Sequence, residues 1–133
     1  MTGVQTCALP IFIARMPLQF GLLTGKFDKQ ATFTGNDHRK NRLTAAVIEK
    51  TREATAPVWE LCEKYQCTKT ALALSYILSY PEVSVAIPGI RTPEQASANT
   101  DGLFRLDIAD RSMIESLGAA SFPALMELIR AQG

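Results

Sequence analysis

The chain has 133 residues, of which 47% are hydrophobic and 20% are charged, and its formal net charge at pH 7 is +1. These values are typical of one soluble globular unit, and they give no electrostatic reason to expect nucleic acid or an anionic membrane as a partner. No stretch has the roughly 18 consecutive apolar residues that would span a bilayer. The N-terminus also lacks the pattern of a secretory signal, so we expect a cytoplasmic protein.

Three cysteines and one histidine limit the metal and redox chemistry of the chain. Cys62 and Cys67 stand in a C-x4-C arrangement, and Cys7 lies far upstream. This spacing, with a single histidine, does not supply a common tetrahedral zinc site, so no metal site is predicted. A reducing compartment is the default, with Cys62 as a small apolar helix residue.

The first residues are not typical of the start of a domain. Residues 1–10 show no period and lead abruptly into an apolar run. We expect them to be a non-native or disordered leader, and a frayed native terminus is the alternative. The run itself, Ile11 to Ala14, predicts a buried strand.

Two loops are predicted after this strand. In the first, Pro17 to Lys26, Gly21 and Gly25 permit close backbone approach or a positive φ. Residues 28–41 are polar and rich in turn signals, and they predict a long surface loop. His38 lies in this loop, where it is expected to be a surface residue rather than a catalytic base.

Helical periodicity begins at Leu43 and meets a proline at Pro57. This predicts either two helices or one helix kinked at the proline, with Thr55 as the N-cap of the second. Thr68 is predicted to cap the next helix. The nearly all-apolar sequence of that helix, through Leu78, indicates burial on more than one side.

The most informative stretch joins an apolar strand to a capped helix. Val83 to Ile87 alternates large apolar with small residues as a buried strand does, and Pro88-Gly89 ends the ladder. Thr92 is the predicted N-cap, Pro93 falls at the first helical position, and Gln95 completes a T-x-x-Q capping box.

This junction is suited to holding an anion. A phosphate would meet unpaired backbone donors, the positive end of a helix dipole and the guanidinium of Arg91. The alternative is an ordinary capped turn with a solvated arginine, because most capping boxes bind no ligand.

The rest of the sequence completes an α/β pattern. We expect the helix from Pro93 to reach about Phe104, a short helix to follow over Asp110 to Leu117, and the tail over residues 118–133 to be partly helical. The order of strands and helices is that of a parallel α/β protein. Two strands do not close a sheet, so the chain is predicted to be a piece of a larger parallel sheet or barrel, with ligands at the carboxyl ends of its strands.

Three segments resemble the C-terminal third of the aldo-keto reductases, the NADPH-dependent (β/α)8-barrel oxidoreductases. They are M-P-L-Q-F-G-L-L-T-G-K-F at Met16 to Phe27, A-L-A-L-S-Y-I-L-S at Ala71 to Ser79, and I-P-G-I-R-T-P-E-Q-A-S-A-N at Ile87 to Asn99. The resemblance implies an incomplete TIM barrel over residues 11–117 that contains the last two β/α units. The D-H-R segment at Asp37 to Arg39 resembles one branch of the family.

The resemblance also implies where a cofactor would bind. The family positions that line the pyrophosphate and the nearby ribose, partly through backbone groups, correspond here to Met16, Pro17, Leu18 and Lys26. The positions beside the 2′-phosphate of NADP are Gly89 and Arg91, and the adenine-contacting amides are Gln95 and Asn99. Arg39, in the long loop, would supply a second positively charged side chain to the cofactor site. Ala98 departs from the family, which often has Glu at that position, and leucines such as Leu18 are more often core than cofactor contacts.

The implied function is that of a C-terminal fragment of an NADP-dependent reductase of small carbonyl compounds. The family's catalytic Tyr, Lys, His and Asp belong to the first half of the barrel, so no catalytic residue is assigned here and the chain alone is expected to be inactive. The alternative is a non-catalytic regulatory subunit on the same barrel, as in potassium-channel beta subunits. We expect no nucleic-acid or membrane partner, and the sequence does not indicate an oligomeric state.

Overall fold

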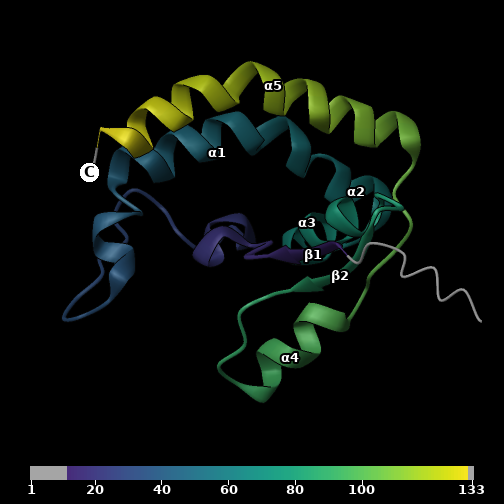
Figure 1. The fold of residues 1–133 in the computed structure, drawn as a ribbon, viewed down its shortest axis with the longest axis horizontal. Coiled ribbons are helices and arrows are strands. Elements are labelled where there is room, and N and C mark those ends of the chain that lie inside the picture. The colour runs from purple at the N-terminus through teal and green to yellow at the C-terminus, as the bar shows by residue number, and fades with distance from the viewer. Residues whose placement is uncertain (1–11, 132–133) are drawn as a thin grey trace, which may run out of the picture.

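The computed structural model describes residues 12–131 (Figure 1). The predicted leader, Cys7 and Ile11 lie outside the described residues. In chain order the elements are strand β1 (Phe12–Arg15), 3-10 helices η1 (Gln19–Thr24) and η2 (His38–Asn41), helices α1 (Ala45–Trp59), α2 (Leu61–Tyr65) and α3 (Lys69–Leu78), strand β2 (Val83–Ile87), and helices α4 (Pro93–Thr100) and α5 (Ile108–Arg130).

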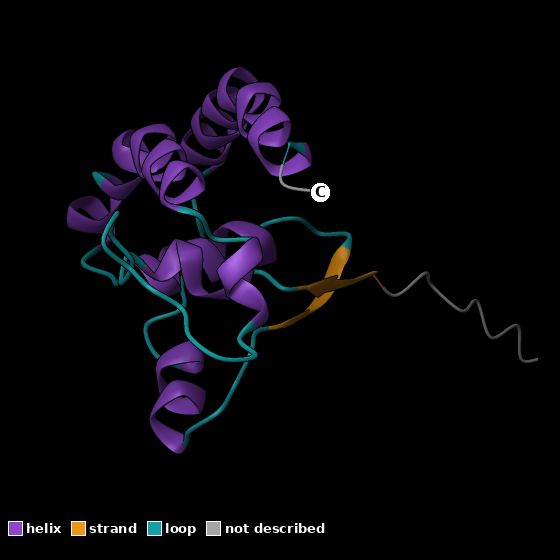
Figure 2. Cartoon of the chain, turned by 90° about the vertical axis from the view of Figure 1, so that its left-hand side faces the viewer, coloured by secondary structure: helices purple, strands orange, loops and turns teal. Residues whose placement is uncertain are grey.

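The sheet within the described residues is the parallel pair β1–β2. The register pairs Phe12 with Val83 and Arg15 with Ile87, with an irregularity after Phe12. Figure 2 shows the two strands on one side of the helices. A parallel pair needs a crossover connection, and the segment from η1 to α3 provides it. The prediction of a parallel α/β arrangement is therefore confirmed.

The prediction that both strands are buried was wrong for this chain. Val85 and Ile87 are 45% and 53% exposed, and Phe12 and Ile13 are 59% and 48% exposed. Helix α3 packs against β2. Each strand has one partner strand among the described residues, whereas parallel strands are normally buried by neighbours on both faces.

The core lies among the helices. One cluster contains Val58, Leu61, Leu72 and Leu106, and a second contains Leu18, Ala73 and Leu74. Five consecutive residues of α3, 71–75, are buried, which confirms the prediction that this helix is covered on several sides. Thr68 caps α3 as predicted, with its Oγ1 accepting the amide hydrogen of Ala71 at 3.1 Å.

Helix α1 passes through Pro57 and ends at Trp59, so the alternative of two helices divided at the proline was wrong. Thr55 is not an N-cap, because its hydroxyl donates to the carbonyl of Thr51 at 2.8 Å inside the helix. A proline in a helix removes one amide donor, and here the packing of α1 along α5 outweighs that loss. The actual boundary is Glu60, between α1 and α2.

Two further helix bounds differ from the prediction. Helix α4 ends at Thr100 rather than near Phe104, because Asp101 is extended and Gly102 takes a φ of +66°. Helix α5 is continuous from Ile108 to Arg130 and crosses both Gly118 and Pro123, so the short helix predicted over residues 110–117 was wrong. Figures 1 and 2 show α5 lying alongside α1, and this packing supports the long helix. None of the described helices is long and apolar enough to cross a membrane.

Candidate functional site

Two loops meet at the carboxyl edge of the sheet. Because Arg15 pairs with Ile87 at the ends of two parallel strands, the residues that follow them, Met16-Pro17 and Pro88-Gly89, leave the sheet at the same edge. Ligands of open and closed parallel sheets bind at this edge. The structure thus brings together the two segments in which the sequence placed its candidate site.

The loop after β1 is held in an unusual backbone conformation. Met16 and Phe20 take φ values of +56° and +59°, a region that costs free energy for residues other than glycine and is common at ligand sites. The amide of Gln19 donates to the carbonyl of Met16 at 3.0 Å, which closes the turn. Met16 is 38% exposed, whereas Leu18 is buried against Ala73 and Leu74. The Leu18 side chain is thus a core residue.

Lys26 folds back over Gly21. A Cβ atom on Gly21 would lie 3.1 Å from Cε of Lys26, and Gly21 has a φ of +90°. The ammonium of Lys26 lies 5.0 Å from the ring centroid of Phe27. The glycine therefore makes room for an exposed cation near the loop after β1.

The start of α4 confirms the predicted cap and adds one contact. Thr92 Oγ1 accepts the amide hydrogen of Gln95 at 3.3 Å, and Pro93 occupies the first turn. The Gln95 Oε1 accepts the amide hydrogen of Arg91 at 2.8 Å. The expectation of unpaired donors at this turn was therefore wrong for the amides of Arg91 and Gln95, because the cap uses both.

A carboxylate also lies at this helix start. Glu94 accepts hydrogen bonds from the Thr92 hydroxyl and from its own amide, and these hold the pKa of the carboxyl below its usual value. Arg91 is exposed, and no acidic side chain within residues 12–131 forms an ion pair with it. An incoming phosphate would replace the Glu94 and Gln95 side chains on these amides, with the Arg91 guanidinium available beside them.

Asn99 provides an independent sign of a missing partner. Its side chain is 8% exposed, and its buried Nδ2 has no hydrogen-bond acceptor. Buried amide donors are nearly always satisfied, so an unsatisfied one calls for a ligand or water. Gln95 lies one helical turn earlier and is exposed, and a Cβ atom on Gly89 would meet open space. These residues fit a group that carries both a phosphate and an acceptor such as a purine nitrogen.

Arg39 is already paired where it lies. Its guanidinium contacts the Asp37 carboxylate through Nη2 at 2.5 Å and through Nε at 2.9 Å, and it lies 4.8 Å from the centroid of the Phe33 ring. The ion pair raises the pKa of Arg39 and holds that of Asp37 well below its usual range. In this arrangement Arg39 orders the long loop. Neighbouring His38 is exposed, as expected, and contacts the Phe20 ring.

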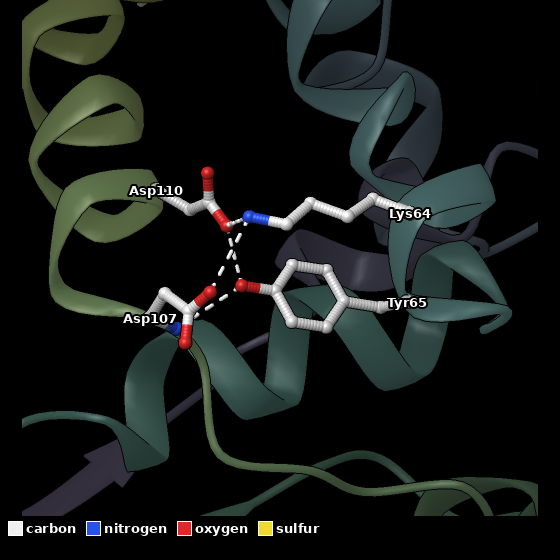
Figure 3. Close-up of polar contacts among 4 residues, drawn as sticks. All are labelled: Lys64, Tyr65, Asp107 and Asp110. Atoms are coloured by element: carbon white, nitrogen blue, oxygen red, sulfur yellow. Dashed lines mark hydrogen bonds and ion pairs between the residues drawn. The ribbon is translucent and has the colours of Figure 1, made fainter.

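Sequence reasoning missed a polar cluster formed by Lys64, Tyr65, Asp107 and Asp110 (Figure 3). The Tyr65 hydroxyl donates to the Asp110 carboxylate and accepts the amide hydrogen of Asp107 at 3.1 Å. The Lys64 ammonium lies 2.6 Å from Asp110 Oδ2. More than forty positions separate the partners, so no local pattern could indicate them.

The electrostatics of this cluster indicate a structural role. Burial and the neighbouring Asp110 raise the pKa of Tyr65, and the hydrogen bond from Lys64 lowers that of Asp110. Both shifts move these groups away from proton transfer near neutral pH. The cluster ties α2 to the start of α5.

Comparison with known proteins agrees with the motifs at the sheet edge. The sequence model described as "Aldo/keto reductase family" matches residues 10–119. The chain is also similar to the NADH-specific methylglyoxal reductase of Escherichia coli (strain K12), with 30% identity over 105 residues. That match covers 78% of this chain and 32% of the relative, so the chain spans about a third of the relative's length. No solved structure gave a significant match. With a family match that covers most of its length, this chain belongs to the aldo/keto reductase family.

Proposed function

We propose that this chain is the C-terminal, cofactor-binding part of a (β/α)8-barrel oxidoreductase that reduces small carbonyl compounds. The observation that carries the proposal is the parallel β1–β2 pair, whose carboxyl ends open into the loop after Met16 and into the capped start of α4. The exposed faces of both strands suit the addition of further strands and helices. Family membership supports the same conclusion.

The cofactor is proposed to be a nicotinamide dinucleotide, and specifically NADP. Bound at this edge, it would supply a hydride to the carbonyl carbon of the substrate. Met16, Pro17, Leu18 and Lys26 would lie along the pyrophosphate, with Leu18 contributing its backbone. Gln95 and Asn99 would face the adenine, and the unsatisfied Nδ2 of Asn99 supports this position.

The preference for NADP rests on Arg91 and Gly89. NADP carries a dianionic phosphate that NAD lacks, and an exposed guanidinium at a helix N-terminus suits that charge. The similar methylglyoxal reductase of Escherichia coli is named as specific for NADH, which is a property of that protein. Arg39 is a weaker candidate for a second cation, because it would have to leave Asp37.

The test is the reduction of a small reactive carbonyl compound such as methylglyoxal, with NADPH or NADH as hydride source. The 133-residue chain is compared with a form extended upstream through the remaining strands of the barrel. We expect turnover in the extended form alone, because no catalytic residue is assigned in this chain. Turnover by the 133-residue chain above the buffer rate would contradict the prediction that the catalytic residues lie in the first half of the barrel. An extended form that folds but shows no turnover would contradict the proposed reductase function.

A further inference from the structure

The turn between α2 and α3 places two cysteines at paired positions. Helix α2 ends at Tyr65, and the residue that caps it, Gln66, has left-handed φ and ψ values of 49° and 46°. The amide of Cys67 donates to the carbonyl of Cys62 at 3.0 Å, and the amide of Gln66 donates to that of Glu63 at 3.4 Å. These two bonds define a Schellman motif, in which the first and last residues bring their side chains into contact. Here those residues are Cys62 and Cys67.

The two thiols are free and adjacent. Neither is in a disulfide, and each is half-buried. The Cys67 thiol donates a hydrogen bond to the Cys62 sulfur. Burial raises the pKa of both thiols, that of Cys67 to about 11, while the hydrogen bond and the charge of Lys69 oppose the rise at Cys62. The surroundings of Cys62 therefore include groups that favour its thiolate, and those of Cys67 do not.

We propose that Cys62 and Cys67 form a reversible intrachain disulfide when the protein meets a small disulfide oxidant such as oxidised glutathione. Cys62 loses its proton to solvent and attacks one sulfur of the oxidant, which releases the first thiolate and leaves a mixed disulfide. Cys67 then loses its proton and attacks the Cys62 sulfur, which releases the second thiolate. The two protein thiols lose two electrons in total, and the oxidant gains them, so no other reactant is needed.

The bond would join the last turn of α2 to the first residue after its left-handed cap. Both cysteines pack against the cluster of Val58, Leu61 and Leu72, so the bond would form beside the core. It would link residues that are already neighbours in one turn, and no distant segment would have to move. A disulfide requires two cysteines whose backbones lie close together, and the 3.0 Å bond from the Cys67 amide to the Cys62 carbonyl holds these two backbones together. Oxidation would therefore hold the α2–α3 connection in its present conformation.

The test uses the full chain with Cys7→Ser, so that only the pair remains. The protein is incubated with oxidised glutathione without denaturant, its remaining thiols are alkylated, and its mass is measured. We expect a loss of about 2 Da, the two hydrogens removed when one S–S bond forms. Trypsin cleavage after Lys64 then separates the two cysteines, so the bond appears as peptide 53–64 linked to peptide 65–69.

Two controls sharpen the result. Cys7→Ser/Cys67→Ser keeps Cys62 alone and should stop at the mixed disulfide with glutathione. The same incubation of Cys7→Ser in urea should give at least about tenfold less of the linked pair relative to the mixed disulfide, because the folded turn raises the effective concentration of the second thiol. Two glutathione adducts, two alkylated thiols, or equal yields with and without urea would each overturn the proposal.

Discussion

The helical layer and the sheet edge differ in how far their apolar side chains find partners within this chain. In α3, Leu72 and Leu74 are 1% and 2% exposed, whereas in β2 Val85 and Ile87 are 45% and 53% exposed. Both segments have apolar sequences, so the difference lies in the neighbours that pack on them. An apolar pattern thus predicts which side chains favour burial, and the rest of the fold decides whether they are buried.

The largest expected effect concerns the state of the whole chain. Unpaired strand edges with exposed apolar side chains favour association, so we expect the 133-residue chain to self-associate or stay partly molten. Ile87→Lys places a charge on the exposed strand and should lower the associated fraction in sedimentation velocity. Ser116→Lys adds the same charge on α5 and should not. A wild-type monomer with a sharp, cooperative thermal transition would contradict this prediction.

The next largest effect is expected when an apolar side chain is truncated in the helical layer rather than in the sheet. Leu72→Ala removes a side chain that is 1% exposed, and it should lower the free energy of unfolding by about 2–5 kcal/mol. Val85→Ala in the sheet should change it by less than about 0.5 kcal/mol, because that residue is already 45% exposed. Both are measured by urea unfolding with helical circular dichroism, in the Ile87→Lys background. Equal losses would show that the sheet is as well packed as the helices.

The polar cluster between α2 and α5 should contribute less. Tyr65→Phe removes the hydrogen bonds to Asp107 and Asp110, and it should lower the free energy of unfolding by about 1 kcal/mol. The matched control is Tyr76→Phe, which removes the hydrogen bond between the Tyr76 and Tyr80 hydroxyls. Tyr76→Phe should lower the free energy of unfolding by less than Tyr65→Phe does. A larger loss in Tyr76→Phe would contradict the structural role of the polar cluster.

The same cluster predicts a dependence on pH. The pKa of Asp110 is lowered in the folded state by hydrogen bonds from Lys64 and Tyr65. Because its pKa in the folded state lies below the unfolded value of about 3.9, the ionised Asp110 stabilises the folded state fully above that value. This stabilisation is lost as the pH falls through the folded pKa. Asp110→Asn should remove that part of the acid dependence of Tm. An unchanged acid slope would contradict the contribution of this ion pair.

A further comparison concerns the N-caps of α3 and α4. Thr68→Ala should lower the free energy of unfolding by about 1 kcal/mol, because Thr68 caps the buried helix α3. Thr92→Ala should instead fray α4 locally, since Asn99 is the one buried residue of that helix. Amide hydrogen exchange separates the outcomes: protection should fall across α3 in the first variant and only across α4 in the second.

Short-range features of the fold could be predicted from the sequence. The Thr68 and Thr92 caps and the parallel β1–β2 arrangement were all predicted, because each depends on residues close in the chain or on the order of elements. The helix bounds were less predictable. Pro57 and Pro123 each remove one donor, but the packing of α1 along α5 keeps both helices continuous.

The sequence predicted which loops follow the two strands, but not the contacts that the candidate residues make there. The sequence placed Met16 and Arg91 after the two strands, and the parallel register brings those strand ends together. It could not indicate that Gln95 occupies the Arg91 amide, that Asp37 pairs with Arg39, or that Asn99 Nδ2 lacks a partner. Each of these depends on side-chain conformations that several sequences could adopt.

The most direct test compares NADP and NAD binding by a form that contains the whole barrel, with and without Arg91→Glu. Loss of the contact between a guanidinium and a dianionic phosphate should weaken NADP binding by at least about tenfold. NAD binding should change little, and Arg52→Glu on the exposed face of α1 should leave both dissociation constants unchanged. Equal affinity of the wild type and Arg91→Glu for NADP would contradict the phosphate site at the start of α4.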